Sequence, residues 1–209
     1  MKRTLTPEWL DSLPADDPGA KRSRRDLRRI NAFMGNASWI LRQLPKDVRR
    51  ISELGAGDGS LLRRLAQQYR EAQLCGYDLQ HRPDSLEPRV EWVQGDVLDS
   101  PPVAGGGVLI ANLILHHFTD GQLRDLGSFV RRFDFLVINE PRRARLPMAL
   151  SRLATPFVNG ITRHDMRVSI EAGFVAGEMP RLLGLSDEEY GIRESSTWRG
   201  SQRVLACRS

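Results

Sequence analysis

Residues 51–61 read ISELGAGDGSL and place three alternate glycines between two apolar segments. The run at 48–54 is typical of a buried strand, while 60–70 repeats leucine and alanine at helical spacing. Glycine at such a junction allows backbone conformations that other residues avoid, and it lets a ligand lie against the main chain. The stretch therefore predicts a strand, a binding loop and a helix, although a tight turn that binds nothing would use the same residues.

Strand-like and helical runs alternate through most of the remaining chain. The pattern predicts strands at 72–77, 90–93, 108–113, 133–139 and 202–207, and helices at 120–132, 146–158 and 163–172. Arg199-Gly200 supplies the turn of a terminal hairpin. A β-α-β-α order is typical of a parallel sheet with helices on both faces. We therefore expect an α/β fold with a doubly wound, mostly parallel sheet.

The N-terminal segment departs from this alternation. Residues 1–22 contain three prolines and predict a loose leader. From residue 24 apolar side chains recur at spacings of three and four, which predicts one or two amphipathic helices before Pro45. We expect residues 23–46 to form a helical cap and residues 47–209 to form the main domain.

Composition excludes several classes of protein. An apolar content of 40% is too high for wholesale disorder, and no apolar run is long enough to span a bilayer. The start of the chain has no apolar signal core, so a cytoplasmic protein is expected. The net charge of +5 could serve a polyanionic partner, but no aromatic residues interleave with the basic clusters at 21–29 and 142–145. A solvated basic face is favoured over nucleic-acid binding.

Three residues around the glycine loop indicate which class of ligand it binds. A dinucleotide fingerprint would have glycine at position 60, where this chain has Ser60. Glu53 would repel a pyrophosphate and favour a cation. Asp78 ends the next strand about twenty residues on, where a carboxylate can accept both hydroxyls of a ribose. A nucleoside with a positively charged tail meets all three conditions.

On these residues the sequence resembles the class I S-adenosylmethionine-dependent methyltransferases, over roughly residues 48–208. The resemblance implies a seven-stranded sheet whose last strand is antiparallel, with S-adenosylmethionine as cofactor. It also implies roles for individual residues. Glu53, Gly55 and Gly57 would lie against the methionine moiety, Asp78 would hold the ribose, Asp96 would receive the adenine amino group beside Val97, and Asn112 and Leu113 would lie under the cofactor. Asp78 and Asp96 could instead be ordinary loop or capping carboxylates.

Two histidines follow the fourth predicted strand. A base helps methyl transfer most when the acceptor is a hydroxyl, and the ordinary pKa of histidine suits that task. His116 and His117 are adjacent, so at most one should face a substrate. The alternative is that one caps the following helix and the other packs against the cofactor.

A third histidine lies in the helix predicted at 163–172. His164 could reach the same pocket or be satisfied at the surface, while Thr162 is expected to cap the helix with Asp165 as partner. Glu140, at the end of the fifth strand, could line the pocket or position the arginines that follow it. The three histidines and Glu140 show no fixed ligand spacing, so no metal site is expected.

The resemblance also limits the classes of molecule that could accept the methyl group. Residues 112–115 read NLIL and lack the Asn/Asp-Pro-Pro-aromatic motif of the branch that methylates nucleobase amines. We expect a small, partly hydrophobic acceptor of the phenol or quinone type. Phe33, Met34 and Trp39 could close over it, and packing of the N-terminal helices explains these three residues equally well. The alternatives are an RNA methyltransferase, which only the basic segment supports, and a regulatory protein that binds the cofactor without transfer.

Overall fold

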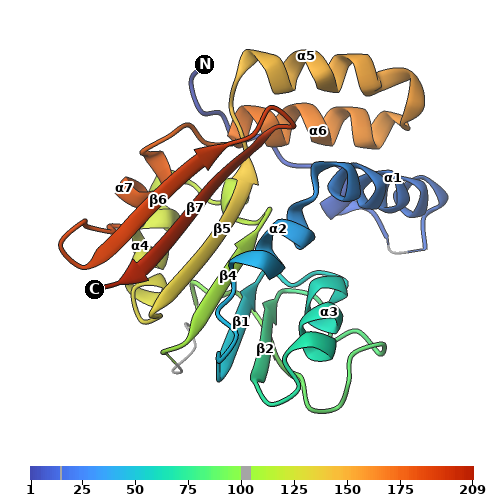
Figure 1. The fold of residues 1–209 in the computed structure, drawn as a ribbon. Helices are drawn as coiled ribbons and strands as arrows, with labels where there is room; N and C mark the ends of the chain where they lie inside the picture. Colours follow the sequence, from blue (N-terminus) through green and yellow to red (C-terminus); the bar gives the residue numbers. More distant parts are fainter. Residues whose placement is uncertain (15, 100–104) are drawn as a thin grey trace.

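The computed structural model describes residues 1–14, 16–99 and 105–209 and contains one seven-stranded sheet (Figure 1). The strands are β1 (Arg50–Leu54), β2 (Gln73–Asp78), β3 (Glu91–Gln94), β4 (Val108–Asn112), β5 (Phe135–Pro141), β6 (Tyr190–Ser196) and β7 (Ser201–Arg208). Their order is β3-β2-β1-β4-β5-β7-β6. Strands β1 to β5 pair in parallel, and β7 runs antiparallel to both β5 and β6. The predicted α/β fold with a mostly parallel seven-stranded sheet is confirmed.

The helices cover both faces of the sheet and its upper edge in Figure 1. They are α1 (Pro18–Met34), α2 (Asn36–Gln43), α3 (Ser60–Gln68), α4 (Asp120–Val130), α5 (Arg145–Ala154), α6 (Gly160–Ala172) and α7 (Glu178–Leu182), with short 3-10 turns η1 (Leu10–Ser12), η2 (Leu115–His117) and η3 (Thr155–Phe157). In the described residues, no helix has the length and apolarity needed to cross a bilayer.

Strand β4 shows why the central strands read as continuous apolar runs. Val108 and Ile110 join the core cluster with α2 and α3, whereas Leu109 and Ala111 join the cluster with α4 and α7. Both faces of the strand are therefore buried, and neither set of alternating positions can be polar.

Helix α6 lies beside the carboxyl ends of β4 and β5 and carries α1 and α5 on its other sides (Figure 1). It begins earlier than the sequence predicts, because Asn159 rather than Thr162 caps it. The Asn159 side chain accepts a 2.8 Å hydrogen bond from the Thr162 backbone N–H. The Thr162 hydroxyl donates to the same Asn159 oxygen at 2.8 Å and makes a buried 2.9 Å hydrogen bond with the Ser23 hydroxyl of α1. Thr162 thus joins two helices that are 139 positions apart.

The segment predicted to be a loose leader is held against the domain. The Arg3 guanidinium donates to the carbonyl oxygens of Ala172 and Phe118, both at 2.8 Å, and pairs with Asp120 at 2.7 Å. The backbone N–H of Trp9 donates to the Asp165 carboxylate at 2.8 Å. The prolines of this segment predicted a loose leader. The prediction failed because composition carries no information about contacts with residues far along the chain. Helix α1 also begins within this segment, at Pro18.

Candidate active site

The glycine loop after β1 has the backbone that its sequence predicts. Gly55, Gly57 and Gly59 all adopt positive φ angles, of 67°, 54° and 68°. A Cβ on Gly55 would come within 2.5 Å of the Ile114 side chain, whereas a Cβ on Gly57 would meet no atom of the described residues within 4 Å. Gly55 is therefore required for packing, and Gly57 borders open space into which a ligand can fit.

Glu53 lies behind this loop as a buried carboxylate. It is 3% exposed, and its Oε2 atom has no hydrogen-bond partner among the described residues. Burial, together with the negative charges of Asp58 and Asp78, raises the pKa of Glu53 well above its usual value. A buried oxygen without a partner is costly, so the arrangement suits a ligand that brings a positively charged donor.

The ends of β2 and β3 adjoin the loop. Asp78 accepts hydrogen bonds from the backbone N–H groups of Gly57, at 2.7 Å, and Gln80, at 2.8 Å. Each carboxylate oxygen retains a lone pair for a further donor. Asp96 is exposed and accepts from the Leu98 N–H at 2.9 Å, while Val97 packs against the core beneath. The structure thus places Glu53, Gly55, Gly57, Asp78, Asp96 and Val97 at the carboxyl ends of three adjacent strands, a region here called the crevice.

The end of β4 separates this crevice from a second space. Asn112 accepts a 2.9 Å hydrogen bond from the Asn139 side chain. Leu113 has a φ of 59°, a left-handed conformation that is uncommon for leucine, and its N–H donates to the Asn139 carbonyl at 2.9 Å. Leu113 lines a cavity, whereas its neighbour Ile114 lies against Gly55. One short segment therefore forms a wall of both spaces.

The cavity has a volume of about 660 Å³, which suits a small organic molecule. Most of its wall is apolar and comes from α1, α5 and α6, including Phe33, Met34 and Leu150. His116, His117 and Glu8 supply polar atoms at one end. Phe33 and Met34 lie where the sequence predicts. Trp39 is not part of the wall and packs instead beneath the Arg203 guanidinium, 4.5 Å from its ring centre.

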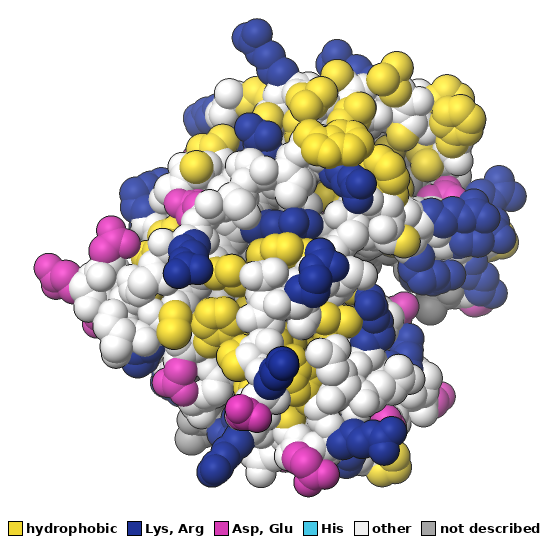
Figure 2. All heavy atoms as spheres, viewed as in Figure 1, with side chains coloured by type: hydrophobic (Ala, Val, Ile, Leu, Met, Phe, Trp, Pro, Cys, Tyr) yellow, Lys and Arg dark blue, Asp and Glu magenta, His cyan; other side chains and the backbone are white. Residues whose placement is uncertain are grey.

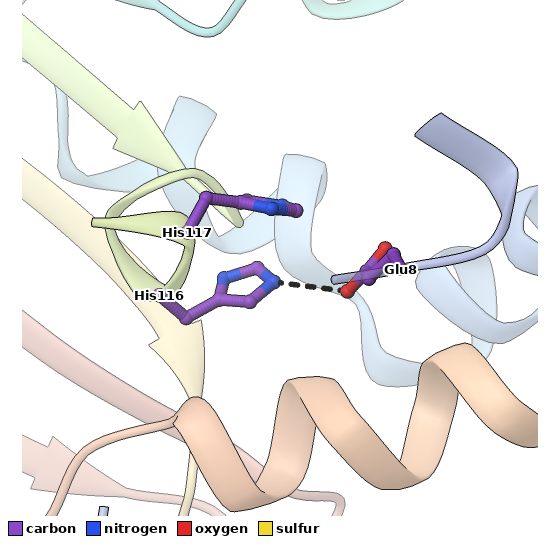
Figure 3. Close-up of side chains that lie close together, drawn as sticks. All are labelled: Glu8, His116 and His117. Atoms are coloured by element: carbon purple, nitrogen blue, oxygen red, sulfur yellow. Dashed lines mark ion pairs between the residues drawn. The ribbon is translucent and has the colours of Figure 1, made fainter. Parts of the chain in front are cut away.

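His116 is held from two sides. Its Nδ1 atom lies 2.8 Å from Glu140 Oε2, and Nε2 lies 3.4 Å from Glu8 Oε1 (Figure 3). Glu140 also accepts the backbone N–H groups of Ile114 and Leu115, so it fixes the turn as well as the ring. Burial disfavours a charged ring, but the hydrogen bonds and charges of Glu140 and Glu8 outweigh it and raise the pKa of His116 to about 9.

The pKa values of two neighbours of His116, His117 and Glu8, are lowered rather than raised. Burial and the positive charge on His116 lower the pKa of His117, whose Nδ1 lies 3.6 Å from Asp11. Burial alone would raise the pKa of Glu8, but its contacts with His116, His117 and the Ser169 hydroxyl lower it. Glu8 is therefore a carboxylate that faces an imidazolium at neutral pH.

Glu8, His116 and His117 each offer one atom within 4.8 Å of the others, a spacing that a metal ion could bridge (Figure 3). Two of these residues, His116 and Glu8, also form an ion pair with each other. The expectation that the site holds no metal stays a prediction.

His164 takes a different position from the other two histidines. Its ring stacks on Trp9 with 4.0 Å between centroids, and its Nδ1 lies 3.0 Å from Asp165. His164 does not belong to the cavity wall. Sequence reasoning missed Glu8, which carries no motif and lies in the segment predicted to be loose. Glu140 was predicted either to line the pocket or to position arginines, and its contacts with residues 114–116 could not be foreseen from spacing.

No protein-family model matches the sequence. A segment of 84 residues, 39% of this chain, is 29% identical to demethylspheroidene O-methyltransferase of Rhodobacter capsulatus, and it spans 21% of that protein's length. The structure resembles the plantazolicin methyltransferase BpumL, solved with SAH and a monoazolic desmethylPZN analog. That match has a TM-score of 0.71 at 12% identity and covers 92% of this chain and 91% of BpumL. The chain has the class I methyltransferase fold.

A second solved structure of this methyltransferase fold is the human N-acetylserotonin methyltransferase in complex with SAM. Its TM-score is 0.64 at 16% identity, and the match covers 95% of this chain and 61% of the human one. The expected Rossmann-like methyltransferase fold is therefore confirmed.

Proposed function

We propose that this protein transfers a methyl group from S-adenosylmethionine to an oxygen of a small, partly hydrophobic acceptor of the phenol or quinone type. The observation that carries the proposal is the buried His116–Glu140 pair, whose His116 lines a mostly apolar cavity two positions after Ile114, the residue that packs against Gly55 of the glycine loop. The short segment 113–116 thus connects a proton acceptor with the nucleoside crevice.

The crevice residues fit the cofactor. The unpartnered oxygen of Glu53 suits the ammonium of the methionine moiety, and the open side of Gly57 leaves room beside it. The free lone pairs of Asp78 suit the ribose hydroxyls, while Asp96 and Val97 would meet the adenine. S-adenosylmethionine, when bound, supplies a methyl group on a positively charged sulfur.

Asn112 and Leu113 would then lie between the cofactor and the acceptor. Asn112 is fixed by Asn139, whose own side-chain oxygen accepts from Arg203 at 3.1 Å. Since this segment is held by side-chain and backbone hydrogen bonds, it can position an acceptor without reorganising, which favours an in-line displacement.

The acceptor proton is assigned to His116. Glu140 fixes Nδ1. The other nitrogen, Nε2, is the one that faces Glu8 (Figure 3). An acceptor hydroxyl that replaces Glu8 at Nε2 would give its proton to the neutral ring. Its oxygen would take the methyl group as the carbon–sulfur bond breaks, and the sulfur would leave as the neutral thioether. Removing Glu8 from the ring lowers the pKa of His116, which favours that neutral form.

The nature of the cavity supports the acceptor class. Its wall is mostly apolar, and His116 is one of the polar residues in it, so the cavity suits a hydrophobic body whose polar group meets His116. The Rhodobacter relative is an O-methyltransferase, which favours oxygen as the accepting atom.

A turnover assay with radiolabelled S-adenosylmethionine tests the proposal. Purified protein is incubated with a panel of phenols and hydroquinones, with matched anilines and thiols, and with bulk RNA. We expect label in the phenol or hydroquinone products alone. Transfer confined to RNA, or cofactor binding without transfer to any member of the panel, would contradict the proposal.

A further inference from the structure

A stripe of exposed apolar side chains follows α5 and the turn after it. Leu146, Leu153 and Phe157 are 49%, 71% and 83% exposed. Leu146 and Leu153 are seven positions apart and lie on one side of α5, in line with Leu150, and Phe157 follows in η3. Large apolar groups so exposed and so aligned usually mark an interaction surface.

Two aromatic side chains extend this stripe. Phe33 at the end of α1 and Trp198 before β7 are 59% and 56% exposed, and their rings pack edge to face at 6.1 Å. Phe33, Trp198 and Phe157 also line the cavity. The five residues Phe33, Leu146, Leu153, Phe157 and Trp198 are here called the apolar rim; three of them line the cavity that contains His116, and the two leucines lie on the exposed side of α5.

Positive charge surrounds the apolar rim. Helix α1 carries six basic residues and one acidic residue, Asp26, which is buried. Residues 141–164 include five arginines and no carboxylate, and Arg145, Arg152 and Arg163 of this stretch are exposed. Figure 2 shows the hydrophobic side chains gathered over the upper part of the molecule, with the basic side chains of α1 beside them.

We propose that the apolar rim docks on an anionic lipid surface. Aromatic and leucine side chains would enter the boundary between headgroups and acyl chains, while the flanking arginines would pair with lipid phosphates. The cavity would then face the bilayer, and a hydrophobic molecule could enter without crossing water. Docking itself is independent of the proposed function, whereas delivery of an acceptor from the membrane rests on it.

Charge favours this partner over a second copy of the chain. A two-fold interface formed by the apolar rim would bring two arginine-rich α1 helices toward each other, and like charges disfavour that arrangement. An anionic surface complements the same charges.

Vesicle flotation tests the proposal on the full chain. The protein is mixed with vesicles of phosphatidylcholine alone or with about 30% phosphatidylglycerol, at low and high salt. We expect flotation with the anionic vesicles and its loss at high salt, because exposed charges are screened. The double variant Leu146→Ser, Leu153→Ser should float about tenfold less, since neither side chain lines the cavity and both would enter the lipid. Leu79→Ser, at a similarly exposed leucine away from the apolar rim, is the matched control.

A charge variant tests the second half of the surface. Arg25→Gln with Arg28→Gln on α1 should weaken binding about fivefold for each arginine, compared with Arg124→Gln and Arg181→Gln on α4 and α7. No flotation of the wild-type protein, equal flotation of rim and control variants, or a dimer that the Leu146→Ser, Leu153→Ser variant abolishes would each overturn the proposal. Turnover on water-soluble phenols without vesicles separates this outcome from failure of the proposed function.

Discussion

The crevice and the cavity lie on either side of Leu113 and Ile114, yet they are assembled in different ways. The crevice comes from the loops after β1, β2 and β3, so most of its residues lie within about 45 positions of one another. The cavity joins Glu8, α1, η2, α5, α6 and the turn before β7, which span most of the chain. The common fold thus supplies the crevice, and chain-specific packing supplies the cavity.

Their electrostatics differ as well. In the crevice, Glu53 is buried with one oxygen unpartnered, and its pKa is raised by burial and by nearby carboxylates. In the cavity, His116 is buried between two carboxylates that raise its pKa. Among the described residues, one Glu53 oxygen in the crevice has no hydrogen-bond partner, whereas His116 in the cavity is paired with two carboxylates. Variants in the crevice should therefore change cofactor binding, whereas variants in the cavity should change methyl transfer to the acceptor.

The largest expected effect is at His116. Replacing it in His116→Asn should lower kcat by about 10²–10⁴-fold, because the general base is lost, while affinity for S-adenosylhomocysteine changes less than twofold. Steady-state assays and calorimetry measure the two quantities. His81→Asn, at an exposed histidine, is the control. If His117→Asn or His164→Asn shows the large loss of kcat instead, His116 is not the residue that accepts the proton.

Two glycine variants distinguish a glycine that is needed for packing from one that leaves room for the ligand. Gly55→Ala should destabilise the fold by about 3 kcal/mol, because its Cβ meets Ile114 and its φ is positive. Gly57→Ala should cost only about 1 kcal/mol of stability but should weaken cofactor binding. Denaturant unfolding and calorimetry separate the two effects, and equal losses of stability would contradict the packing argument.

Asp78 tests the crevice alone. Asp78→Ala should weaken cofactor affinity by about 1–3 kcal/mol, since a pair of ribose hydroxyls loses its acceptor. Turnover at saturating cofactor should fall much less. Asp134→Ala, which alters a carboxylate at the opposite ends of the strands, gives the comparison. Unchanged binding by Asp78→Ala would remove the ribose assignment.

The smallest effect concerns pH. The folded-state pKa of His116 is about 9 against 6.5 for the free ring, so its ion pairs stabilise the fold fully below pH 6.5. That stability is lost as the pH rises toward 9, by on the order of 1–3 kcal/mol. Glu8→Gln should flatten the decline, because one of the two carboxylates is gone. Thermal unfolding from pH 6 to 9.5 measures it, and parallel curves for the two proteins would contradict the pairing.

The difference between the crevice and the cavity also explains which site residues could be predicted from the sequence. The glycine loop, Glu53 and Asp78 follow one another at strand ends, and parallel strands bring such positions to one edge without knowledge of the rest of the chain. Placing His116 at the end of β4 followed from the same rule. Glu8 could not be found in this way, because its position depends on contacts of Arg3 and Trp9 with residues more than 100 positions away.

Helix boundaries show the same limit. The sequence predicts a cap at Thr162, since threonine followed by an acidic residue is a common pattern. Asn159 is an equally good cap and lies where the chain leaves η3, so tertiary position decides between them. The stacking of His164 on Trp9 likewise depends on the path of residues 1–14, which local pattern does not determine.

The central claim is that the crevice beginning at Glu53 binds a nucleoside with a positively charged tail. Calorimetric titration of the purified protein with S-adenosylmethionine and S-adenosylhomocysteine, beside NADH and FAD, tests it directly. The account predicts saturable heat with the first two compounds, reduced in Asp78→Ala, and none with the dinucleotides. Heat with a dinucleotide, together with none from either sulfur compound, would contradict it.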